Sequence, residues 1–284
     1  MTSPNVVPII ALITDFGLRD PYVGIMKGVI TAIAPQSKLI DISHDIPPGD
    51  IHRGAITLWQ IKDFFPAGTI FLSVIDPGVG TPRRGIILFS GNQIFVGPDN
   101  GLFSYVTAHQ FEAWELKNPR FQLPNPGKTF HGRDIFAPCA AYYASGIPGS
   151  QFGPAVPDIV QLDLPILLIN TDQIQGEILF SDHFGNLITS LGRWTLVEQG
   201  IYRFYPWLDR GSYHSPEIIT SIREAKLELP EGSSLNWVET FADIPPEECA
   251  VLVGSSGLLE IAANNAPATT RLNLSPGDPV TLFL

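Results

Sequence analysis

A short polar stretch after an apolar run near residue 75 holds the residue types that proton-transfer chemistry needs. Thr69–Ile75 is apolar enough for a buried strand, and Asp76 follows it directly, ahead of Pro77-Gly78 and Arg83. A carboxylate placed at a strand end can accept a proton, and a cation close behind can hold it in position. Asp-Pro-Gly is also ordinary turn chemistry, so a purely structural Asp76 is an equal alternative on this stretch alone.

Polar side chains also follow other predicted strands. They lie at Asp15, in the turn Pro98–Gly101 and in the run Thr129–Asp134. Because ligands collect outside the carboxyl ends of strands in open α/β sheets, a carboxylate, an arginine and a histidine on such loops can converge on one pocket. Each has a structural alternative: Asp15 can cap a turn, Asp134 is expected to cap a helix, and a lone His131 is more often a satisfied polar residue.

Alternating strands and helices in the first half of the chain must position these side chains. We expect strands at Pro8–Thr14, Lys38–Ile42 and Thr69–Ile75, a hairpin of Gly85–Ser90 and Gln93–Val96, and helices beginning with Asp20-Pro21, at Ile51–Phe64 and at Asp134–Ser145. This order predicts an α/β fold with a mostly parallel sheet flanked by helices. The pattern stops at the proline-rich stretch Gly153–Pro165.

Short strands separated by Gly, Pro, Asn and Asp are typical of the second half. We expect them at Gly176–Ser181, Leu187–Leu191, Ala250–Val253, Leu258–Ala262 and Pro279–Phe283. Such a pattern predicts a smaller all-β domain, a sandwich or a barrel. The sequence thus predicts two domains, an α/β domain over 1–164 and a β domain over 172–284.

Composition narrows the class of protein. The 284 residues are 44% hydrophobic, with a net charge of −11 and no cluster of Lys or Arg, so nucleic acid is not an expected partner. No apolar run reaches the roughly 20 residues that a membrane span needs. Met1–Val7 lacks the features of a signal peptide, which predicts a cytoplasmic protein. Cys139 and Cys249 are too few for a disulfide framework or a thiolate metal site.

Two common motif classes do not fit. The sequence has no G-x-G-x-x-G or G-K-[ST] loop, which argues against dinucleotide or P-loop chemistry. Gly254–Gly257 reads G-S-S-G, which lacks the G-x-S-x-G spacing of a nucleophilic serine. We therefore interpret this segment as a backbone-rich turn that contacts a ligand.

Six motifs in a fixed order identify a family. They are I-T-D-F-G at Ile13–Gly17, D-P-G-V-G-T-P-R-R at Asp76–Arg84, V-G-P-D-N-G at Val96–Gly101, T-F-H-G-R-D at Thr129–Asp134, H-F-G-N-L-I-T at His183–Thr189 and G-S-S-G-L-L-E-I-A at Gly254–Ala262. The chain closely resembles the S-adenosylmethionine (SAM) hydroxide adenosyltransferases, the SAM hydrolase branch of the superfamily that includes the SAM-dependent fluorinase and chlorinase. The resemblance implies an α/β N-terminal domain and a C-terminal β-barrel. It also implies a homotrimer that holds SAM between neighbouring subunits.

The resemblance also implies roles for individual residues. Asp76, Arg83 and His131 match the water-activating trio, and no cofactor or metal is implied because SAM is the substrate. The residues implied to bind SAM are Asp15 at the ribose hydroxyls, Asp20 at the methionine ammonium, Thr129 and Phe130 on the nucleophile's side, Phe184 and Asn186 at the adenine, Phe241 as a second aromatic wall, and Ser255 and Ser256 at the methionine end. The halogenases instead carry an arginine where Ser256 stands.

The chemistry of SAM supports the same function. Attack at C5′ expels neutral methionine from a sulfonium, so the leaving group needs no general acid, whereas water needs a base. The halogenases carry tyrosines at the positions of Asp76 and His131, and the fluorinase a serine at that of Gly132. A carboxylate beside the nucleophile would repel a halide. We predict hydrolysis of SAM to adenosine and L-methionine.

Two alternatives from other classes remain. A metal-dependent phosphoesterase could use Asp15, Asp76, Asn100 and His131 as hard ligands, although clustered metal-ligand spacing is lacking. A non-catalytic adenosine or SAM sensor would need the pocket without the trio.

Overall fold

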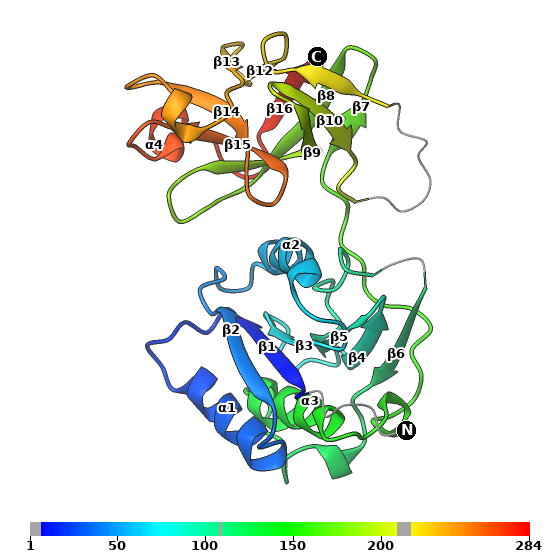
Figure 1. Cartoon of the computed structure of the whole chain (residues 1–284). Coiled ribbons are helices and arrows are strands. Elements are labelled where there is room, and N and C mark those ends of the chain that lie inside the picture. The colour runs from blue at the N-terminus through cyan, green and yellow to red at the C-terminus, as the bar shows by residue number, and fades with distance from the viewer. Residues whose placement is uncertain (1–6, 108–109, 209–216) are drawn as a thin grey trace. The chain divides into compact units, whose positions relative to one another are not determined.

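Two compact units make up the chain in the computed structural model (Figure 1), which describes residues 7–107, 110–208 and 217–284. The first unit spans residues 1–162 and the second residues 163–284. Each unit has hydrophobic core clusters of its own. None of the helices in the described ranges is long and apolar enough to cross a membrane.

A six-stranded sheet with the order β2-β1-β3-β5-β4-β6 forms the centre of the first unit. Its strands are β1 (Ile9–Thr14), β2 (Lys38–Ser43), β3 (Ile70–Val74), β4 (Gly85–Ser90), β5 (Gln93–Pro98) and β6 (Phe111–Glu115). Neighbours β2, β1, β3 and β5 run parallel, and β4 is antiparallel to both of its neighbours. The predicted mostly parallel sheet is confirmed, and β6 is a strand that the sequence analysis missed.

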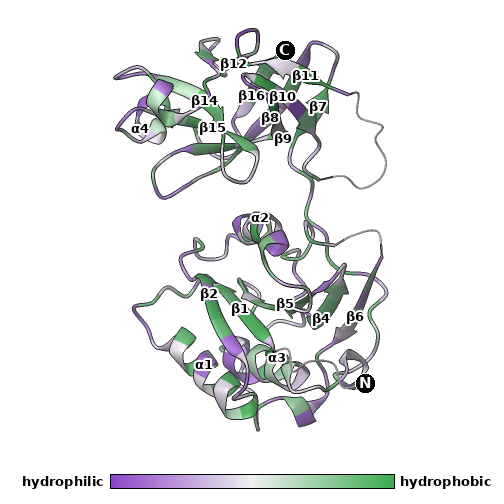
Figure 2. Cartoon of the chain, viewed as in Figure 1, coloured by the Kyte–Doolittle hydropathy of each residue, from purple (hydrophilic) through white to green (hydrophobic). Residues whose placement is uncertain are grey.

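Helices cover both faces of this sheet. The helices are α1 (Tyr22–Ile33), α2 (Ile51–Ile61) and α3 (Ala137–Ala144), and short 3-10 turns lie at Lys62–Phe64, Pro119–Phe121 and Gly149–Gln151. Met26 of α1 and Ala140 of α3 belong to the core on one face, and Leu58 of α2 to the core on the other. Burial on both faces explains the continuous apolar runs of β1 and β3 (Figure 2).

Two predicted helix starts are wrong in detail. Pro21, and not Asp20, occupies the N-cap position of α1, and no side chain caps that helix. Asp134 does not cap α3 either, because it lies within a π-helical turn at Gly132–Phe136 that precedes α3. Its carboxylate instead accepts hydrogen bonds from the Arg133 side chain and from the Gly127 backbone, which compete for the oxygens a cap would use.

The second unit is largely antiparallel β-structure, which confirms the predicted fold class. Its strands are β7 (Leu167–Ile169), β8 (Gln173–Ser181), β9 (Leu187–Glu198), β10 (Ile201–Tyr205), β11 (Ile219–Ser221), β12 (Lys226–Glu228), β13 (Ser234–Asn236), β14 (Cys249–Val253), β15 (Leu258–Ala263) and β16 (Pro279–Phe283). A 3-10 turn at Phe241–Asp243 and helix α4 (Ala268–Leu272) lie between strands. The main path of the sheet is β11-β10-β9-β8-β16-β12-β13, and β15 extends it from β9 to β14. The sequence analysis missed β7 and β10 to β13.

Candidate active site

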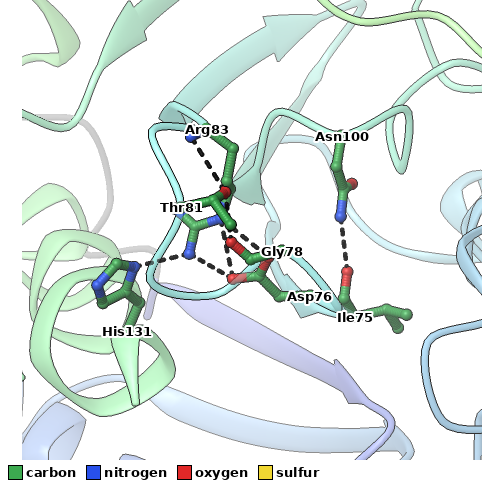
Figure 3. Close-up of polar contacts among 7 residues, drawn as sticks. All are labelled: Ile75, Asp76, Gly78, Thr81, Arg83, Asn100 and His131. Carbon is green, nitrogen blue, oxygen red and sulfur yellow. Dashed lines mark hydrogen bonds and ion pairs between the residues drawn. The ribbon is translucent and has the colours of Figure 1, made fainter. Parts of the chain in front are cut away.

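Asp76 and Arg83 form a buried ion pair at the carboxyl end of β3. The Arg83 Nε–H lies 2.9 Å from Asp76 Oδ1 and 3.0 Å from Oδ2, and the Arg83 Nη2 group donates to Oδ2 as well (Figure 3). Only 5% of the Asp76 side chain and 11% of the Arg83 side chain are exposed. Such a bidentate pair fixes the orientation of the carboxylate. Asp76 is therefore more than the turn residue that its sequence context allowed.

His131 joins this pair through the guanidinium nitrogen Nη2, which also donates to Asp76. The Arg83 Nη2 lies 2.7 Å from His131 Nδ1. Since arginine can only donate, Nδ1 is the acceptor and the ring carries its proton on Nε2. Burial, and then the positive charge of Arg83, lower the pKa of His131, although the Asp76 and Asp134 carboxylates and the Gly127 backbone act in the opposite direction. Both the contact with Arg83 and the lowered pKa favour the neutral form of the ring.

Two loops that are distant in sequence bring these groups together. Gly80 in the loop after β3 has φ of +81°, and a Cβ there would lie 2.6 Å from the carbonyl oxygen of Lys128. Only glycine permits so close an approach of the two backbones. The Arg83 guanidinium also lies 5.2 Å from the centre of the Phe136 ring, on the π-helical turn. The contact between these loops places His131 beside Arg83.

A cavity of about 290 Å³ opens beside the trio. Its lining residues are Phe16, Tyr22, Val74, Asp76, Val79, Thr129, Phe130, His131 and Gly132. Phe16, Tyr22 and Phe130 pack edge to face, with ring centres 5.2 to 5.9 Å apart. The structure therefore places Thr129 and Phe130 at the same cavity as Asp76 and His131. Phe16 and Tyr22 were missed, although Phe16 directly follows Asp15.

Gly132 lies at a crowded part of the cavity wall. A Cβ at this position would lie 3.0 Å from the Phe130 ring and 3.2 Å from Met26 Sδ. The π-helical turn begins at the same residue, and such turns are frequent at functional sites. A side chain at Gly132 would displace these neighbours, so glycine keeps this wall open.

Asp15 lies near Asp76 but is held by a different loop. Its Oδ2 accepts a hydrogen bond of 2.8 Å from the Gly49 backbone. Burial raises the pKa of Asp15 and the charge of Asp76 adds to the effect, while the Gly49 hydrogen bond opposes it. Two carboxylates thus share one end of the sheet. Asp20 is exposed on the turn before α1 and is not among the described residues that line the cavity.

The four residues considered as metal ligands do not assemble as a ligand set. The Asn100 amide nitrogen donates to the Ile75 carbonyl at 2.9 Å (Figure 3). Its oxygen accepts from the Leu102 backbone, so both ends of the amide serve the turn. Both oxygens of Asp76 face Arg83. Within the described ranges, no group of three or more His, Cys, Asp or Glu side chains has the geometry of a metal site.

The second unit has a larger open cavity of about 710 Å³. Phe184, Asn186 and Phe241 line it together with Ala242 and the segment 263–267. Phe184 is 74% exposed and Phe241 is 51% exposed, whereas Asn186 is buried. Two aromatic faces and an amide at one cavity suit a flat heteroaromatic ring. The three residues predicted at the adenine therefore lie around one cavity.

Asp182 organises the loop that carries Phe184 and Asn186. Its Oδ1 accepts from the backbone N–H of both residues at 2.9 Å, and its Oδ2 accepts from the Asn186 side-chain amide at 3.0 Å. This residue was missed, although an aspartate at the start of a loop commonly accepts from the backbone N–H two residues on, as in an Asx turn.

Ser255 and Ser256 lie on the turn between β14 and β15 and do not line this cavity among the described residues. Behind the turn, the Glu260 carboxylate packs against the Gly254 backbone, where a Cβ would lie 2.4 Å from Oε2. Burial, and secondarily the charge of Asp182, raise the pKa of Glu260 to about 7. The Glu260 carboxylate therefore packs against this turn and also interacts electrostatically with Asp182.

The comparisons with known proteins agree with this arrangement of fold and site. The model of the SAM hydroxide adenosyltransferase N-terminal domain matches residues 10–153, and that of the C-terminal domain matches residues 176–281. The chain belongs to the SAM hydroxide adenosyltransferase family, which confirms the predicted family.

Individual relatives match over the whole length. A Thermus thermophilus protein named (R)-S-adenosyl-L-methionine hydrolase is 38% identical to this chain. The match covers 95% of this chain and 98% of the Thermus protein. A protein of Actinoplanes sp. named fluorinase is 29% identical, with 97% of each chain covered. The crystal structure of an uncharacterized conserved protein from Thermotoga maritima superposes with a TM-score of 0.81 at 30% identity, covering 97% of this chain and 100% of that chain.

Proposed function

We propose that this protein hydrolyses SAM to adenosine and L-methionine by attack of an activated water at C5′. The observation that carries the proposal is the Asp76–Arg83–His131 constellation on the wall of an aromatic-lined cavity. The family membership and the hydrolase relatives support the same reaction. A sensor needs no buried, oriented carboxylate at this cavity, and a metal-dependent phosphoesterase would need Asp76 as a ligand, whereas both Asp76 oxygens face Arg83.

Asp76 is the proposed general base. Each carboxylate oxygen has two lone-pair directions, so donation from Arg83 leaves acceptor capacity toward the cavity that Asp76 lines. A water bonded there gives its proton to Asp76 as its oxygen forms the bond to C5′. The C5′–S bond breaks with its electron pair going to sulfur, and the sulfonium becomes neutral methionine thioether.

Arg83 and His131 are proposed to orient this base. Arg83 fixes both oxygens of Asp76, and its charge steadies the hydroxide character that develops on the attacking water. His131 Nδ1 is occupied by Arg83, so this atom cannot take the proton from water. We therefore assign His131 the role of holding the guanidinium, in place of the proton relay that the residue type alone allowed.

The substrate contacts follow the two cavities. We propose that Asp15 binds the ribose hydroxyls, because the carboxylate atom not bonded to Gly49 can accept from a diol. Thr129 and Phe130 would border the reacting centre, and Phe184, Asn186 and Phe241 would hold the adenine. Asp20, Ser255 and Ser256 remain proposals for the methionine end.

A product assay tests the function. Pure protein incubated with SAM should release adenosine and methionine in equal amounts, and the rate should be unchanged in excess chelator. If the rate instead depends on added Mg²⁺ or Mn²⁺, the phosphoesterase is the better interpretation. Tight SAM binding without product would favour the sensor.

We also propose a homotrimer whose active sites combine the first unit of one subunit with the second unit of its neighbour. The support is the resemblance, together with the distribution of proposed catalytic and adenine-binding residues over separate units.

Complementation between two inactive variants tests the shared site. Asp76→Ala damages the first unit, and Asn186→Ala damages the second. If sites are shared, co-expressing the two variants should restore activity in about a quarter of the sites, because some neighbours then supply one intact half each. If each site lies within one subunit, every site keeps a lesion and the mixture stays inactive.

A further inference from the structure

A chain of hydrogen-bonded side chains begins at Thr14, next to Asp15, and leads from buried residues to the surface. Thr14 Oγ1 lies 2.8 Å from His44 Nδ1, and His44 Nε2 lies 3.1 Å from Asp41 Oδ1. Lys27 Nζ in turn lies 2.5 Å from Asp41 Oδ2. The Thr14 side chain is fully buried, and only 1% of the His44 side chain is exposed. Neither Thr14 nor His44 has a part in the mechanism described above.

The directions of these hydrogen bonds follow from the donors and acceptors. An ionised Asp41 can only accept, so His44 Nε2 donates to it, and in the tautomer protonated at Nε2 the Nδ1 atom accepts from the Thr14 hydroxyl. The Thr14 oxygen in turn accepts from the Phe16 N–H at 3.3 Å. Burial acts to raise the pKa of Asp41, but hydrogen bonds from Lys27 and His44 outweigh it and place that pKa below its ordinary value. Asp41 therefore stays ionised and fixes the tautomer of His44.

The loop after β2 thus holds the loop after β1 at three points. The His44 ring accepts from Thr14, the His44 carbonyl accepts from the Gly17 N–H at 2.7 Å, and the Gly49 N–H donates to Asp15 at 2.8 Å. The first two contacts lie on either side of Asp15 in the sequence. The four-residue segment that carries Asp15 is consequently fixed at both ends.

We propose that His44 is a positioning residue for Asp15, acting through Thr14 and the Gly17 backbone. The inference rests on the proposed function, in which Asp15 binds the ribose hydroxyls. A diol needs both of its hydroxyls within hydrogen-bonding distance of the carboxylate, so a displacement of Asp15 weakens substrate binding before it slows the chemical step. His44 touches neither the water-activating pair nor the reacting carbon.

Thr14→Val is the main test, because it removes the hydroxyl and keeps the shape of a fully buried side chain. We expect KM to rise about tenfold with kcat unchanged within about threefold, the size of effect that one lost buried hydrogen bond produces. Thr14→Ser keeps the hydroxyl and should rescue KM. The KM of His44→Asn should lie between those of Thr14→Val and Thr14→Ser, because the asparagine amide can still accept from Thr14 but is too short to reach Asp41. His52→Asn, which alters a histidine on α2 bonded to Tyr105, is the matched control and should leave both constants unchanged.

A double-mutant cycle separates positioning from a merely structural role. In an Asp15→Ala background the ribose carboxylate is gone, so adding Thr14→Val should change KM by less than about twofold. A full tenfold effect in that background would overturn the proposal, and so would an unchanged KM in the single variant.

A measurement without substrate distinguishes this proposal from the proposed function. We call the contacts of His44 with Thr14 and Gly17 the clamp. The Gly17 N–H donates to the His44 backbone carbonyl, which no substitution removes. Faster hydrogen exchange at Gly17 in Thr14→Val and His44→Asn would therefore show that the clamp is loosened. If the parent protein forms no adenosine yet this exchange accelerates, the function fails and the clamp stands. If the parent hydrolyses SAM and neither KM nor the exchange changes, the clamp is refuted.

Discussion

Replacing Asp76 with asparagine tests the proposed base with the least disturbance of shape. The amide has nearly the same volume and keeps one acceptor oxygen, but it cannot carry a proton away from water. Arg83 would lose its bidentate partner while its side chain remains almost fully buried. The substitution therefore acts on catalysis and on stability for separate physical reasons.

Both magnitudes can be worked out from the geometry. Loss of a positioned proton acceptor should lower kcat about 10²–10⁴-fold, which corresponds to about 3–5 kcal/mol on the barrier. Leaving one partner of a buried ion pair uncompensated costs about 3–5 kcal/mol of folding free energy, near the lower end here because the amide still accepts one hydrogen bond. Affinity for SAM should change by less than about threefold, because Asp76 is not assigned to the ribose or the adenine.

Asp99 provides a matched control. It pairs with Arg84, the residue next to Arg83, with Arg84 Nε 2.7 Å from Asp99 Oδ2, and it does not line the cavity among the described residues. The Arg84 side chain is 33% exposed and also pairs with Asp158. Asp99→Asn should therefore lower the melting temperature, though by less than Asp76→Asn because Arg84 keeps Asp158 and solvent as partners, and leave kcat within about threefold of the parent. Adenosine formation under saturating SAM, with calorimetric SAM binding, measures the two effects. Parental turnover in Asp76→Asn, or an equal loss in Asp99→Asn, would refute Asp76 as the base.

Two further predictions use the pKa shifts. Arg83→Gln removes a charge that lowers the pKa of His131, so an NMR titration of that ring should show a higher pKa. Arg84→Gln should leave the pKa of His131 unchanged. A lower pKa of His131 in Arg83→Gln would contradict the assigned contacts. Because the pKa of Glu260 is raised in the folded state, its contribution to stability is complete below about pH 4.5 and is lost as pH rises through about 7. Screening of this partly exposed side chain limits the loss of stability to roughly 1–2 kcal/mol. Glu260→Gln should therefore unfold at a higher temperature than the parent at pH 8 but not at pH 4, while Glu224→Gln, at an exposed position, should leave both unfolding temperatures unchanged. A parallel pH dependence of the unfolding temperature in Glu260→Gln and the parent would contradict this.

The first unit was predictable because its central strands are buried on both faces. An apolar run such as Ile9–Thr14 has no polar alternation, and the helical spacing of Val23, Met26 and Ile30 identifies the next element independently. The edge strand Phe111–Glu115 was missed because two glutamates interrupt its apolar pattern. The short strands β11 to β13 were missed because three residues form a strand only through distant partners, such as β16 for β12.

The candidate site was predictable where residue type and motif agree and not where loops meet. Asp76, Arg83 and His131 combine chemistry with a distinctive local sequence, and the structure brings them together. His44 and Thr14 are 30 residues apart, and neither sits in a pattern that indicates their hydrogen bond. Asp134 shows the opposite error. An aspartate before an apolar helix resembles a cap, but its carboxylate accepts from the neighbouring Arg133 and from the N–H of Gly127, 7 residues earlier.

The charges at this end of the sheet also suit the direction of the proposed reaction. Asp76 is neutralised by Arg83, but Asp15 has no basic side chain among the partners that shift its pKa, and the charge of Asp76 adds to that shift. A sulfonium substrate brings a positive charge toward this carboxylate, which favours its ionised form and strengthens the contact with the ribose. Once the C5′–S bond breaks, the positive charge leaves sulfur, and the proton from water passes through Asp76 to solvent. The attraction that helped to bind SAM is then absent for adenosine and methionine, so the same carboxylate that holds the substrate holds its products less tightly.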